Sequence, residues 1–551
     1  MKKIAGYDKL RGGYYTPELI ADFIVRWAIR SPDDFVLEPS CGDGSFLRSI
    51  SNFLQKNTSW MQEHILGVEL DSIEAKKAEN YGATIVNADF FSYYQKHFHK
   101  QHTYDVVIGN PPFIRSQNFD EKYRKIAFDL MEECGLHPGR LTNIWIPFLV
   151  LSTCLLRENG RLGMVIPAEL LQVDYASEVR KFLSDSYDSL TIITFKELLF
   201  PNAQQEVVLL LGEKNSVAKG IRTIEVQDAQ ELQKIDVSGL EYEVKELNHS
   251  TEKWTQYHLA AREILLLRQL RNDHRLSRAP ELFDVNVGIV SGENDFFIID
   301  KQVCDTYKLK DSTCPIVGRA DQLSGINFTQ EDFDQLISAN RKVFLFTPPN
   351  LELKELSAGD RRYIKYGVSK KYNTGYKCKI RKKWYIVPQS WLPDAFMLRQ
   401  VNKYPRIVLN TLHSQNTDTL HKIRFKHGVV ASTVCAAFLN SFTLALCEIV
   451  GRSYGGGVLT FEPGEVRQLL IPMKGAETLD FDFIDKCVRG NRINDVLDYT
   501  DKILLEQNLG LDTKEILLLR GVWERLSNRR INRKKQRSTL STSTIETKTI
   551  T

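Results

Sequence analysis

The stretch around Asn110 carries residue types that suit transfer of a group to an exocyclic amine. A short, mostly apolar strand is predicted over 104–108, and the chain then runs through Gly109, Asn110, Pro111, Pro112 and Phe113. The strand must end there, because proline has no N–H and fixes φ. A rigid loop with a polar tip therefore follows the carboxyl end of a strand. In open α/β sheets, ligands bind at that edge.

An exocyclic amine is a poor nucleophile because its lone pair is delocalised into the ring. The amide oxygen of Asn110 and the carbonyl oxygen of Pro111 are acceptors that can hold both of its N–H bonds. Holding them favours a pyramidal nitrogen, whose lone pair can then attack. Phe113 offers a face on which a planar base can stack. An ordinary Asn-Pro-Pro turn is the alternative, since both residue types are common in turns.

Length and composition indicate a multidomain globular protein. The chain has 551 residues, of which 42% are hydrophobic and 26% charged, so two or more domains are expected. The nine cysteines form no CxxC pair, which argues against a zinc site or a disulfide framework and favours a reducing cytoplasm. The N-terminus lacks the apolar run of a signal peptide. Residues 431–450 are apolar but interrupted by polar residues, which predicts a buried helix and no membrane span.

The amino-terminal part shows a nucleotide-type turn. A strand predicted over 35–37 runs into Cys41-Gly42-Asp43-Gly44 and then into a helix start. Small residues let a ligand approach the backbone, and a helix N-terminus offers N–H donors. No lysine follows the glycines, so an adenosine that bears a carboxylate suits this turn better than a polyphosphate. Before it, Thr16 is predicted to cap an amphipathic helix over 18–29.

Two further strands end in polar residues. A strand predicted from 65 ends at Glu69, and an acid at the end of the second strand is where ribose hydroxyls are held in doubly wound folds. A third strand, predicted over 83–86, is followed by Asp89 and Phe90. Asp89 is placed to accept from an adenine amino group, and Phe90 to lie against the ring. A solvated strand-end carboxylate is the alternative for any one of these acids, but the set together predicts a nucleoside cofactor site.

These residues together resemble a known family. The ordered segments YTPELI, LEPSCGDGSFL, GVELD, ADFF and IGNPPF are similar to those of the gamma-class amino-methyltransferases that act on DNA adenine, of the TaqI-like restriction–modification branch. The stretch GRLGMVIP resembles that family's next strand, and LFP followed by VVLLL resembles its later motif. The resemblance covers about residues 10–215. The residue after the two prolines is Phe113, where the family more often has tyrosine, and either ring gives a π-face.

The resemblance implies S-adenosylmethionine as the cofactor, with no metal. The residues around its methionine part would be Thr16, Glu38, Cys41, Gly42 and Gly44. Its ribose would be held by Glu69, and its adenine by Asp89 and Phe90. The target adenine would be flipped out of double-stranded DNA, with its amine on Asn110 and Pro111 in the rigid loop that Pro112 extends. Phe113 would stack on one face of that base and Phe200 would pack on the other; a core aromatic is the alternative role for Phe200.

The second half carries a basic and aromatic run. Residues 361–383 hold ten Lys and Arg and no acid, with four tyrosines among them. Basic side chains neutralise phosphates, and tyrosine hydroxyls also donate to them, so the run predicts DNA contact rather than only a solvated face. The predicted DNA-binding residues are Arg361, Arg362, Lys370, Lys371, Lys377, Lys379, Arg381, Lys382 and Lys383.

The expected architecture is α/β. A Rossmann-like, class I S-adenosylmethionine-dependent methyltransferase domain is predicted over 1–220, a connector over 221–270 and a mixed α/β target-recognition domain over 271–528. A basic tail over 529–551 is predicted to be disordered. Residues 114–140 are charged and fit either a mobile segment that faces DNA or a solvated helix and loop.

The expected activity is site-specific methylation of adenine N6 in DNA, with a separate restriction endonuclease or defence subunit as a possible partner. The same first domain would also suit a methyltransferase that acts on RNA adenine or on a protein glutamine. A DNA-specificity protein with an inactive methylase fold is a third alternative, against which the intact Asn110 loop and Glu69 argue. A fused endonuclease is disfavoured, because no cluster of metal-binding carboxylates stands out.

Overall fold

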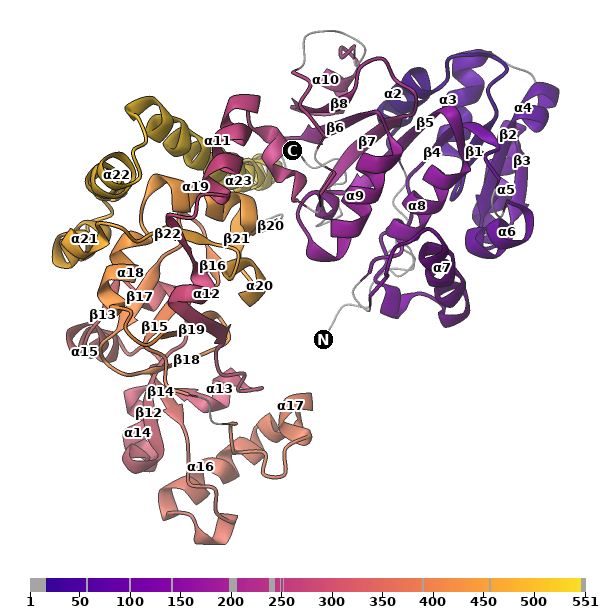
Figure 1. Ribbon diagram of the computed structural model, residues 1–551. Coiled ribbons are helices and arrows are strands. Elements are labelled where there is room, and N and C mark those ends of the chain that lie inside the picture. The colour runs from indigo at the N-terminus through magenta and orange to yellow at the C-terminus, as the bar shows by residue number, and fades with distance from the viewer. Residues whose placement is uncertain are drawn as a thin grey trace. The chain divides into compact units, whose positions relative to one another are not determined.

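The computed structural model describes residues 16–55, 58–98, 101–139, 142–197, 206–236, 243–247, 249–250, 252–388, 391–454 and 457–546, with side chains to 532. The chain forms two compact units. The first extends to Ala261, and the second runs from Arg262 to Ser538 (Figure 1).

An eight-stranded sheet is the frame of the first unit. Its strands are β1 (Val36–Glu38), β2 (Ile65–Glu69), β3 (Thr84–Asn87), β4 (Tyr104–Gly109), β5 (Leu156–Pro167), β6 (Ser189–Phe195), β7 (Val207–Glu213) and β8 (Gly220–Val226). They lie in the order β3-β2-β1-β4-β5-β7-β6-β8. Only β7 runs antiparallel to its neighbours within this sheet. This doubly wound arrangement confirms the predicted Rossmann-like α/β domain.

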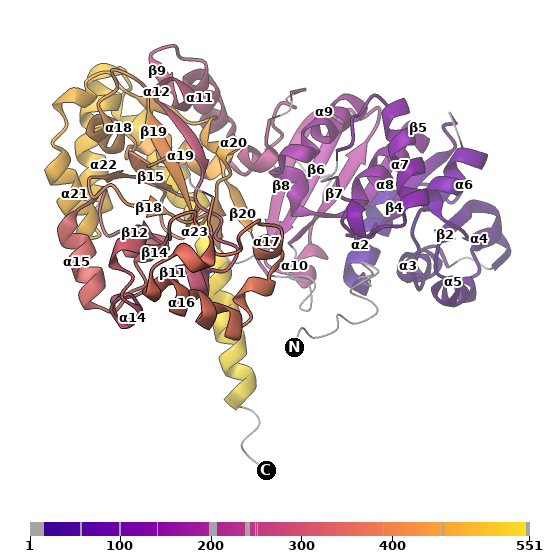
Figure 2. The same cartoon turned by 90° about the horizontal axis from the view of Figure 1, so that it is seen from below.

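Helices cover both faces of that sheet, as Figure 2 shows. One face carries α2 (Glu18–Ala28), α3 (Ser45–Leu54) and α10 (Ala229–Leu232). The other carries α6 (Phe90–His97), α7 (Glu121–Glu133), α8 (Trp145–Leu155) and α9 (Ser177–Ser186). Two short helices, α4 (Thr58–His64) and α5 (Ser72–Ala78), lie by β2 and β3. Ten of the eleven residues of α8 are buried, which fits a helix that is apolar all round.

The predicted strands are confirmed, and their carboxyl ends meet at one edge. The parallel register pairs Glu38 of β1 with Gly67 of β2, and Leu37 with Val107 of β4. The loops that follow β1, β2, β3 and β4 therefore lie along the same edge of the sheet. The predicted helix over 18–29 is also confirmed, but its cap is not. Pro17 occupies the N-cap position without a side-chain bond, and Thr16 lies one residue before it.

The second unit is a mixed α/β structure, as predicted, and contains several small sheets. A five-stranded sheet has the order β10-β19-β15-β17-β13, and a four-stranded sheet the order β11-β14-β12-β18. Their strands are β10 (Phe283–Val287), β19 (Leu420–Phe425), β15 (Ala395–Leu398), β17 (Ile407–Asn410), β13 (Asn327–Phe328), β11 (Ile298–Ile299), β14 (Phe344–Phe346), β12 (Thr313–Val317) and β18 (Gln415–Asn416). Smaller sheets join β16 (Gln400–Val401), β21 (Val458–Thr460) and β20 (Arg452–Tyr454), and β22 (Leu470–Pro472) with β9 (Leu276–Arg278).

Helices pack around these sheets. They are α11 (Ala261–Arg271), α12 (Ala279–Leu282), α13 (Asn294–Phe297), α14 (Lys301–Tyr307), α15 (Gln330–Ser338), α16 (Ala358–Ser369), α17 (Tyr376–Lys379), α18 (Ala431–Ala437), α19 (Ser441–Val450), α20 (Pro463–Val466), α21 (Phe481–Arg489), α22 (Ile493–Asp501) and α23 (Thr513–Glu546). In the described part of the chain no single helix is both long and apolar enough to cross a membrane. One buried helix was predicted for 431–450, but the structure has two, α18 and α19, which meet at 79°. Every residue of α19 is buried.

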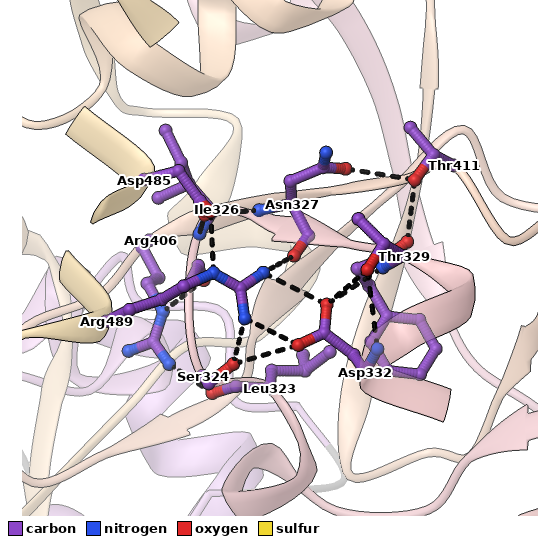
Figure 3. Close-up of polar contacts among 12 residues, drawn as sticks. Leu323, Ser324, Ile326, Asn327, Thr329, Asp332, Arg406, Thr411, Asp485 and Arg489 are labelled. Atoms are coloured by element: carbon purple, nitrogen blue, oxygen red, sulfur yellow. Dashed lines mark hydrogen bonds and ion pairs between the residues drawn. The ribbon is translucent and has the colours of Figure 1, made fainter. Parts of the chain in front are cut away.

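One polar network ties the C-terminal helices to the five-stranded sheet (Figure 3). The guanidinium of Arg489 in α21 donates to Asp332 of α15 at 2.5 and 3.0 Å and to the backbone oxygen of Asn327 at 2.7 Å. Asp485, one turn earlier in α21, accepts from the backbone N–H groups of Ile326 and Asn327. Five charge-assisted bonds in one cluster fix α21 against β13 and α15, since such bonds are stronger than neutral ones.

The structure differs from the predicted domain bounds at two points. Residues 221–226 were expected in a connector, but β8 pairs in parallel with β6 and completes the sheet of the first unit. The predicted disordered tail begins at 529, but α23 continues without a break to Glu546. Arg530 is only 3% exposed and forms an ion pair with Glu448 of α19 at 2.7 Å. The basic segment that was predicted to be disordered thus contributes the Arg530 side chain to the second unit's core.

Candidate active site

A cavity of about 400 Å³ opens at the carboxyl edge of the first unit's sheet. It brings together most of the residues that the sequence indicated. Those that line it are Thr16, Glu38, Cys41, Gly42, Glu69, Asp89, Phe90, Asn110 and Pro112. Gly44, Pro111 and Phe113 do not line it. Phe200 lies outside the described residues.

The loop after β4 is fixed by a bond from its asparagine to a distant residue. The Asn110 Nδ2 atom donates to Oγ1 of Thr16 at 3.2 Å. The oxygen and nitrogen of the planar amide diverge from Cγ, so a bond from Nδ2 to Thr16 leaves the Oδ1 atom turned away from Thr16. Pro111 is buried, and Phe113 is partly buried against the core that α2 and α3 form on the sheet. The loop is therefore held by a hydrogen bond at Asn110 and by packing at Pro111 and Phe113.

Glu38, the last residue of β1, is a buried carboxylate at the cavity wall. Its side chain is 2% exposed, and its Oε2 atom has no hydrogen-bond partner among the described residues. Burial, with the charges of Glu69 and Asp43 nearby, raises its pKa well above the usual value. A buried acceptor without a donor is costly, so this position suits a ligand that brings a cation or an N–H group.

Glu69, the last residue of β2, is held by backbone groups. Its Oε2 atom accepts from the N–H of Gly42 at 2.9 Å, and its Oε1 atom accepts from the N–H of Asp71 at 2.8 Å. Each carboxylate oxygen has two lone pairs, so the oxygens can also accept from ligand hydroxyls. The carboxylate thus joins the turn after β1 to the turn after β2 in a fixed position.

The two predicted glycines of the turn have different roles. Both have a left-handed φ, +53° at Gly42 and +89° at Gly44. A Cβ atom added at Gly42 would meet nothing within 4 Å, which leaves open space on the cavity side. At Gly44 it would lie 2.6 Å from the Tyr81 ring. Gly44 occupies the N-cap position of α3 and lets that helix pack closely, which is a structural role, and it does not line the cavity.

Asp89 and Phe90 both begin α6. Asp89 is the N-cap residue, and its Oδ1 atom accepts from the backbone N–H and the hydroxyl of Ser92, each at 2.8 Å. Burial raises its pKa, and the bonds from Ser92 oppose that shift. Phe90 is buried and stacks on Phe148 of α8, with ring centroids 5.2 Å apart. The aromatic wall of the cavity is thus a pair of rings rather than one.

Cys41 lies in the turn after β1, and its backbone N–H donates to the oxygen of Val68 at 3.0 Å. The side chain is buried. Burial, with the charges of Glu38 and Glu69 nearby, raises the pKa of its thiol. Only a thiolate is nucleophilic, so this residue shapes the cavity and is not a nucleophile.

The sequence did not indicate one wall of the cavity. Residues on this wall come from the segment after the Asn110 loop and from α8, and they are Ile114, Asn118, Phe119, Asp120, Tyr123 and Phe148. Of the two predicted roles for residues 114–140, neither anticipated a contribution to this cavity. The segment forms a short helix at Ser116–Asn118 and then α7, which packs on α6 and α8. The only available signal was Asp120, a helix-capping residue type, directly before a helical pattern.

The basic run of the second unit divides into exposed and structural side chains. Exposed ones, on α16 and α17 and in the segments that follow each of them, include Arg362, Lys370, Lys371, Lys377, Lys379 and Lys382. Three others hold the fold together. Arg361 donates to the backbone oxygen of Leu356 at 2.9 Å, Arg381 to that of Ser291 at 2.7 Å, and Lys383 pairs with Glu352 at 3.2 Å.

The tyrosines of this run divide in the same way. Tyr363 is buried, stacks on Phe296 with centroids 4.7 Å apart, and donates its hydroxyl to the backbone oxygen of Phe296 at 2.6 Å. Tyr376 is 74% exposed. An interleaved basic and aromatic pattern therefore predicts an aromatic core beneath a basic surface as well as it predicts exposed rings.

Within the part of the chain that the structure describes, no group of three or more His, Cys, Asp and Glu side chains is arranged to hold a metal ion. The acids of the cavity are spread over the ends of several strands. Glu69 accepts bonds from backbone N–H groups, and Glu38 is buried without a hydrogen-bond donor to Oε2 among the described residues.

Comparison with known families divides the chain near the boundary between the two units. Residues 1–263 match the family described as N-6 DNA Methylase. Residues 251–505 match the C-terminal domain of the Type II methyltransferase M.Eco57I.

Relatives of similar length are Type II methyltransferases. M.AccI of Acinetobacter calcoaceticus is 25% identical over 90% of both chains. M.BstVI of Geobacillus stearothermophilus is 27% identical over 58% of this chain and 64% of its own length. Among solved structures, the Type IIL restriction–modification enzyme MmeI in complex with DNA covers 93% of this chain and 75% of that chain, with a TM-score of 0.55 and 10% identity. That last likeness concerns the fold alone.

The family matches and the relatives give no support to an RNA or protein acceptor, or to an inactive specificity protein. The family of the N-terminal half implies use of S-adenosylmethionine. The match over the N-terminal half and the Type II relatives identify the protein as a DNA adenine N6-methyltransferase of the restriction–modification type.

Proposed function

We propose that the cavity at the carboxyl edge of the first unit's sheet binds S-adenosylmethionine and that Asn110 and Pro111 hold the amine of a target adenine beside it. The cofactor, when bound, supplies an electrophilic methyl group on a sulfonium. The observation that carries the proposal is that Glu38, Gly42, Glu69, Asp89 and Asn110 line one cavity of about 400 Å³.

The residues of the cavity fit that cofactor at several points. Glu38 has a buried oxygen without a donor, which the ammonium group of the methionine part would satisfy. The open space at Gly42 lets a ligand approach the backbone. Glu69 is held by two N–H groups in a position to accept from the ribose hydroxyls. Asp89 and Phe90 form a polar and an aromatic wall that suit the adenine.

Asn110 and Pro111 would act on the target base by positioning it. The bond from Nδ2 to Thr16 favours the acceptor role for the Asn110 Oδ1 atom, which would accept one N–H of the amine. The carbonyl oxygen of Pro111 would accept the other. Both bonds draw the nitrogen toward a pyramidal geometry. The amine can then attack in line without a strong base, and the loop provides none. Correct placement of two reactants can account for a large part of a rate enhancement.

Phe113 and Phe200 would enclose the flipped base. Phe113 is partly buried at the end of the rigid loop and would offer one ring face to the base. Phe200 stands in the stretch between β6 and β7, which follow Asn110 in the chain. A base taken out of the duplex needs stacking partners to offset the lost base stacking.

The second unit would select the DNA site. The exposed basic residues of α16 and α17 suit contact with phosphates, which position a duplex without reading its sequence. A separate restriction endonuclease, or another subunit of a defence system, would recognise the same DNA site. Methylation at that site would then protect the host DNA.

The test is expression in a host whose DNA carries no methylation, followed by long-read sequencing that detects modified adenine. The wild-type protein is expected to modify one recurring motif. Asn110→Ala is expected to leave the DNA unmodified while the purified variant binds S-adenosylmethionine with nearly unchanged affinity. Equal loss of methylation and of cofactor binding would contradict the proposed role of Asn110. Wild-type protein that binds no S-adenosylmethionine would contradict the cofactor assignment itself.

A further inference from the structure

Residues 114–123, which we name the strap, fold back along the cavity directly after the Asn110 loop. Their contributions to its wall are Ile114, Asn118, Phe119, Asp120 and Tyr123. One bond ties the start of the strap to the segment before α8, and a second joins α7 back to it. The N–H of Ile144 donates to the oxygen of Ile114 at 3.0 Å, and Arg124 Nη1 donates to the oxygen of Ser116 at 3.1 Å. The strap is therefore an ordered part of the cavity wall.

The strap places two rings and a carboxylate on the Asp89 side of the cavity. Phe119 contacts Phe91 edge-on, with centroids 6.1 Å apart, and Tyr123 follows one turn later in α7. Asp120 begins α7, where its Oδ1 atom accepts from the N–H of Lys122 at 2.9 Å. That bond uses one carboxylate oxygen for the helix cap.

Asp120 and Asp89 are electrostatically coupled. The charge of Asp120 is one of the causes that raise the pKa of Asp89, after burial, which is the largest. Two carboxylates that line one cavity repel each other, and a donor placed between them would relieve that repulsion. Asp120 is exposed, so water screens part of it when no ligand is bound. Each also caps its own helix, Asp89 at α6 and Asp120 at α7. A ligand group with two N–H bonds would suit this pair.

We propose that the strap closes the adenine end of the cofactor cavity, and that Asp120 and Asp89 each accept one N–H of the cofactor's 6-amino group. This inference rests on the proposed function, because it names a further contact in the same cavity. It makes Asp120 a residue that selects adenosine over other purine nucleosides. A 6-oxo purine offers no N–H outside its ring, so it would leave both acceptors without a donor.

A simpler role for Asp120 is to cap α7 and nothing more. The substitution Asp120→Ser separates the two roles, since serine is also a good N-cap residue but is shorter and carries no charge. Glu121→Gln is the matched control. Glu121 is the next residue, is 91% exposed in its side chain, pairs only weakly with Arg124 at 3.6 Å, and does not line the cavity.

The experiment measures binding by calorimetry for two ligands, S-adenosylmethionine and its analogue with hypoxanthine in place of adenine. The wild-type protein and Glu121→Gln are expected to bind the adenine ligand at least tenfold more tightly than the analogue. Asp120→Ser is expected to lose about tenfold for the adenine ligand and little for the analogue, so that the preference shrinks. Thermal unfolding without ligand checks that the variant is folded.

An equal loss for both ligands, or no loss for either, would overturn the role of Asp120 and leave it as a cap. Either result would leave the proposed cofactor site intact, because the wild-type protein would still bind S-adenosylmethionine. If the wild-type protein bound the two ligands equally, the preference for the 6-amino group would be overturned for both carboxylates.

Discussion

Thr16 and Asn110, which are 94 positions apart in the chain, are joined by a hydrogen bond of 3.2 Å between Oγ1 and Nδ2. Thr16 lies two residues before α2, which covers one face of the sheet, and Asn110 lies directly after β4. The bond uses the amide nitrogen and thereby determines which end of the Asn110 amide can accept from a substrate amine. A residue that would otherwise be a helix cap thus orients the loop that we propose holds the target adenine.

Thr16→Val is expected to lower the methylation rate by about tenfold, because it removes one hydrogen bond and lets the Asn110 amide rotate. Valine has nearly the same shape, so the fold should change little, and saturating cofactor removes any effect on the affinity for S-adenosylmethionine. Thr16→Ser keeps the hydroxyl and is expected to retain most of the rate. Single-turnover kinetics with saturating cofactor measure the step directly. A rate unchanged in the valine variant would show that the bond does not orient the amide.

The sequence predicted the strand ends well, for a physical reason. Strands β1, β2, β3 and β4 are short apolar runs that stop at Gly, Pro or acidic residues, and parallel pairing then forces those ends to one edge. Local composition is enough to predict such a site. It cannot predict that Thr16 bonds to Asn110 instead of capping a helix, because the competition is decided by a partner distant in the chain.

The strap and the tail were harder to predict because both depend on tertiary packing. Asp120 and Tyr123 belong to a charged segment that resembles a solvated helix, and only the packing of α7 on α6 and α8 directs them into the cavity. Arg530 belongs to a basic cluster, yet an acid on a distant helix, Glu448, makes its burial favourable. Patterns of charge report the average environment of a segment and not the partner of one side chain.

Alanine at Gly42 and at Gly44 should give opposite outcomes. Gly44→Ala is expected to destabilise the protein by roughly 1–3 kcal/mol, because the new Cβ would overlap the Tyr81 ring at 2.6 Å and φ is +89°. Gly42→Ala meets no neighbour and should cost less stability, about 1 kcal/mol for its left-handed φ. Its main effect should be weaker binding of S-adenosylmethionine. Denaturant unfolding and calorimetry on the two variants separate these effects, and equal loss of binding in both would contradict the assignment.

Glu38 should make the stability of the ligand-free protein depend on pH. Its folded pKa lies well above the unfolded value of about 4.3, so the folded state binds more protons between these two values. Stability should therefore fall as pH rises through that window, and binding of a cationic ligand should strengthen over the same range. Glu38→Gln should remove the contribution of this carboxyl to the pH dependence of stability and to the pH dependence of ligand binding. Unfolding and cofactor titrations across pH compare the two proteins, and identical slopes would rule out Glu38 as the titrating group.

The ion pair of Arg530 and Glu448 should be essential to the second unit. Arg530→Met leaves Glu448 buried without its cation and is expected to cost roughly 3–5 kcal/mol of unfolding free energy. The double variant Arg530→Met, Glu448→Met should regain much of that loss, because a neutral pair of similar volume carries no buried charge. Urea unfolding of both variants tests the pair. If Arg530→Met unfolded like the wild-type protein, the C-terminal helix would contribute little to the core.

Exposed and structural basic residues of the run at 361–383 should respond differently to substitution. Lys377 and Lys379 are exposed on α17, so their double substitution by alanine should weaken DNA binding without loss of stability. If each contacts one phosphate, the slope of log affinity against log salt should fall by about 2 in magnitude, since each contact contributes about 0.9. Arg381→Ala should instead destabilise the second unit, because its guanidinium donates to the backbone oxygens of Val290 and Ser291.

Lys310→Ala, which changes an exposed lysine on another segment, is the control for a general effect of charge. Fluorescence anisotropy at several salt concentrations measures the slopes. An unchanged slope in the double variant, with wild-type affinity, would place the DNA on another surface of the second unit.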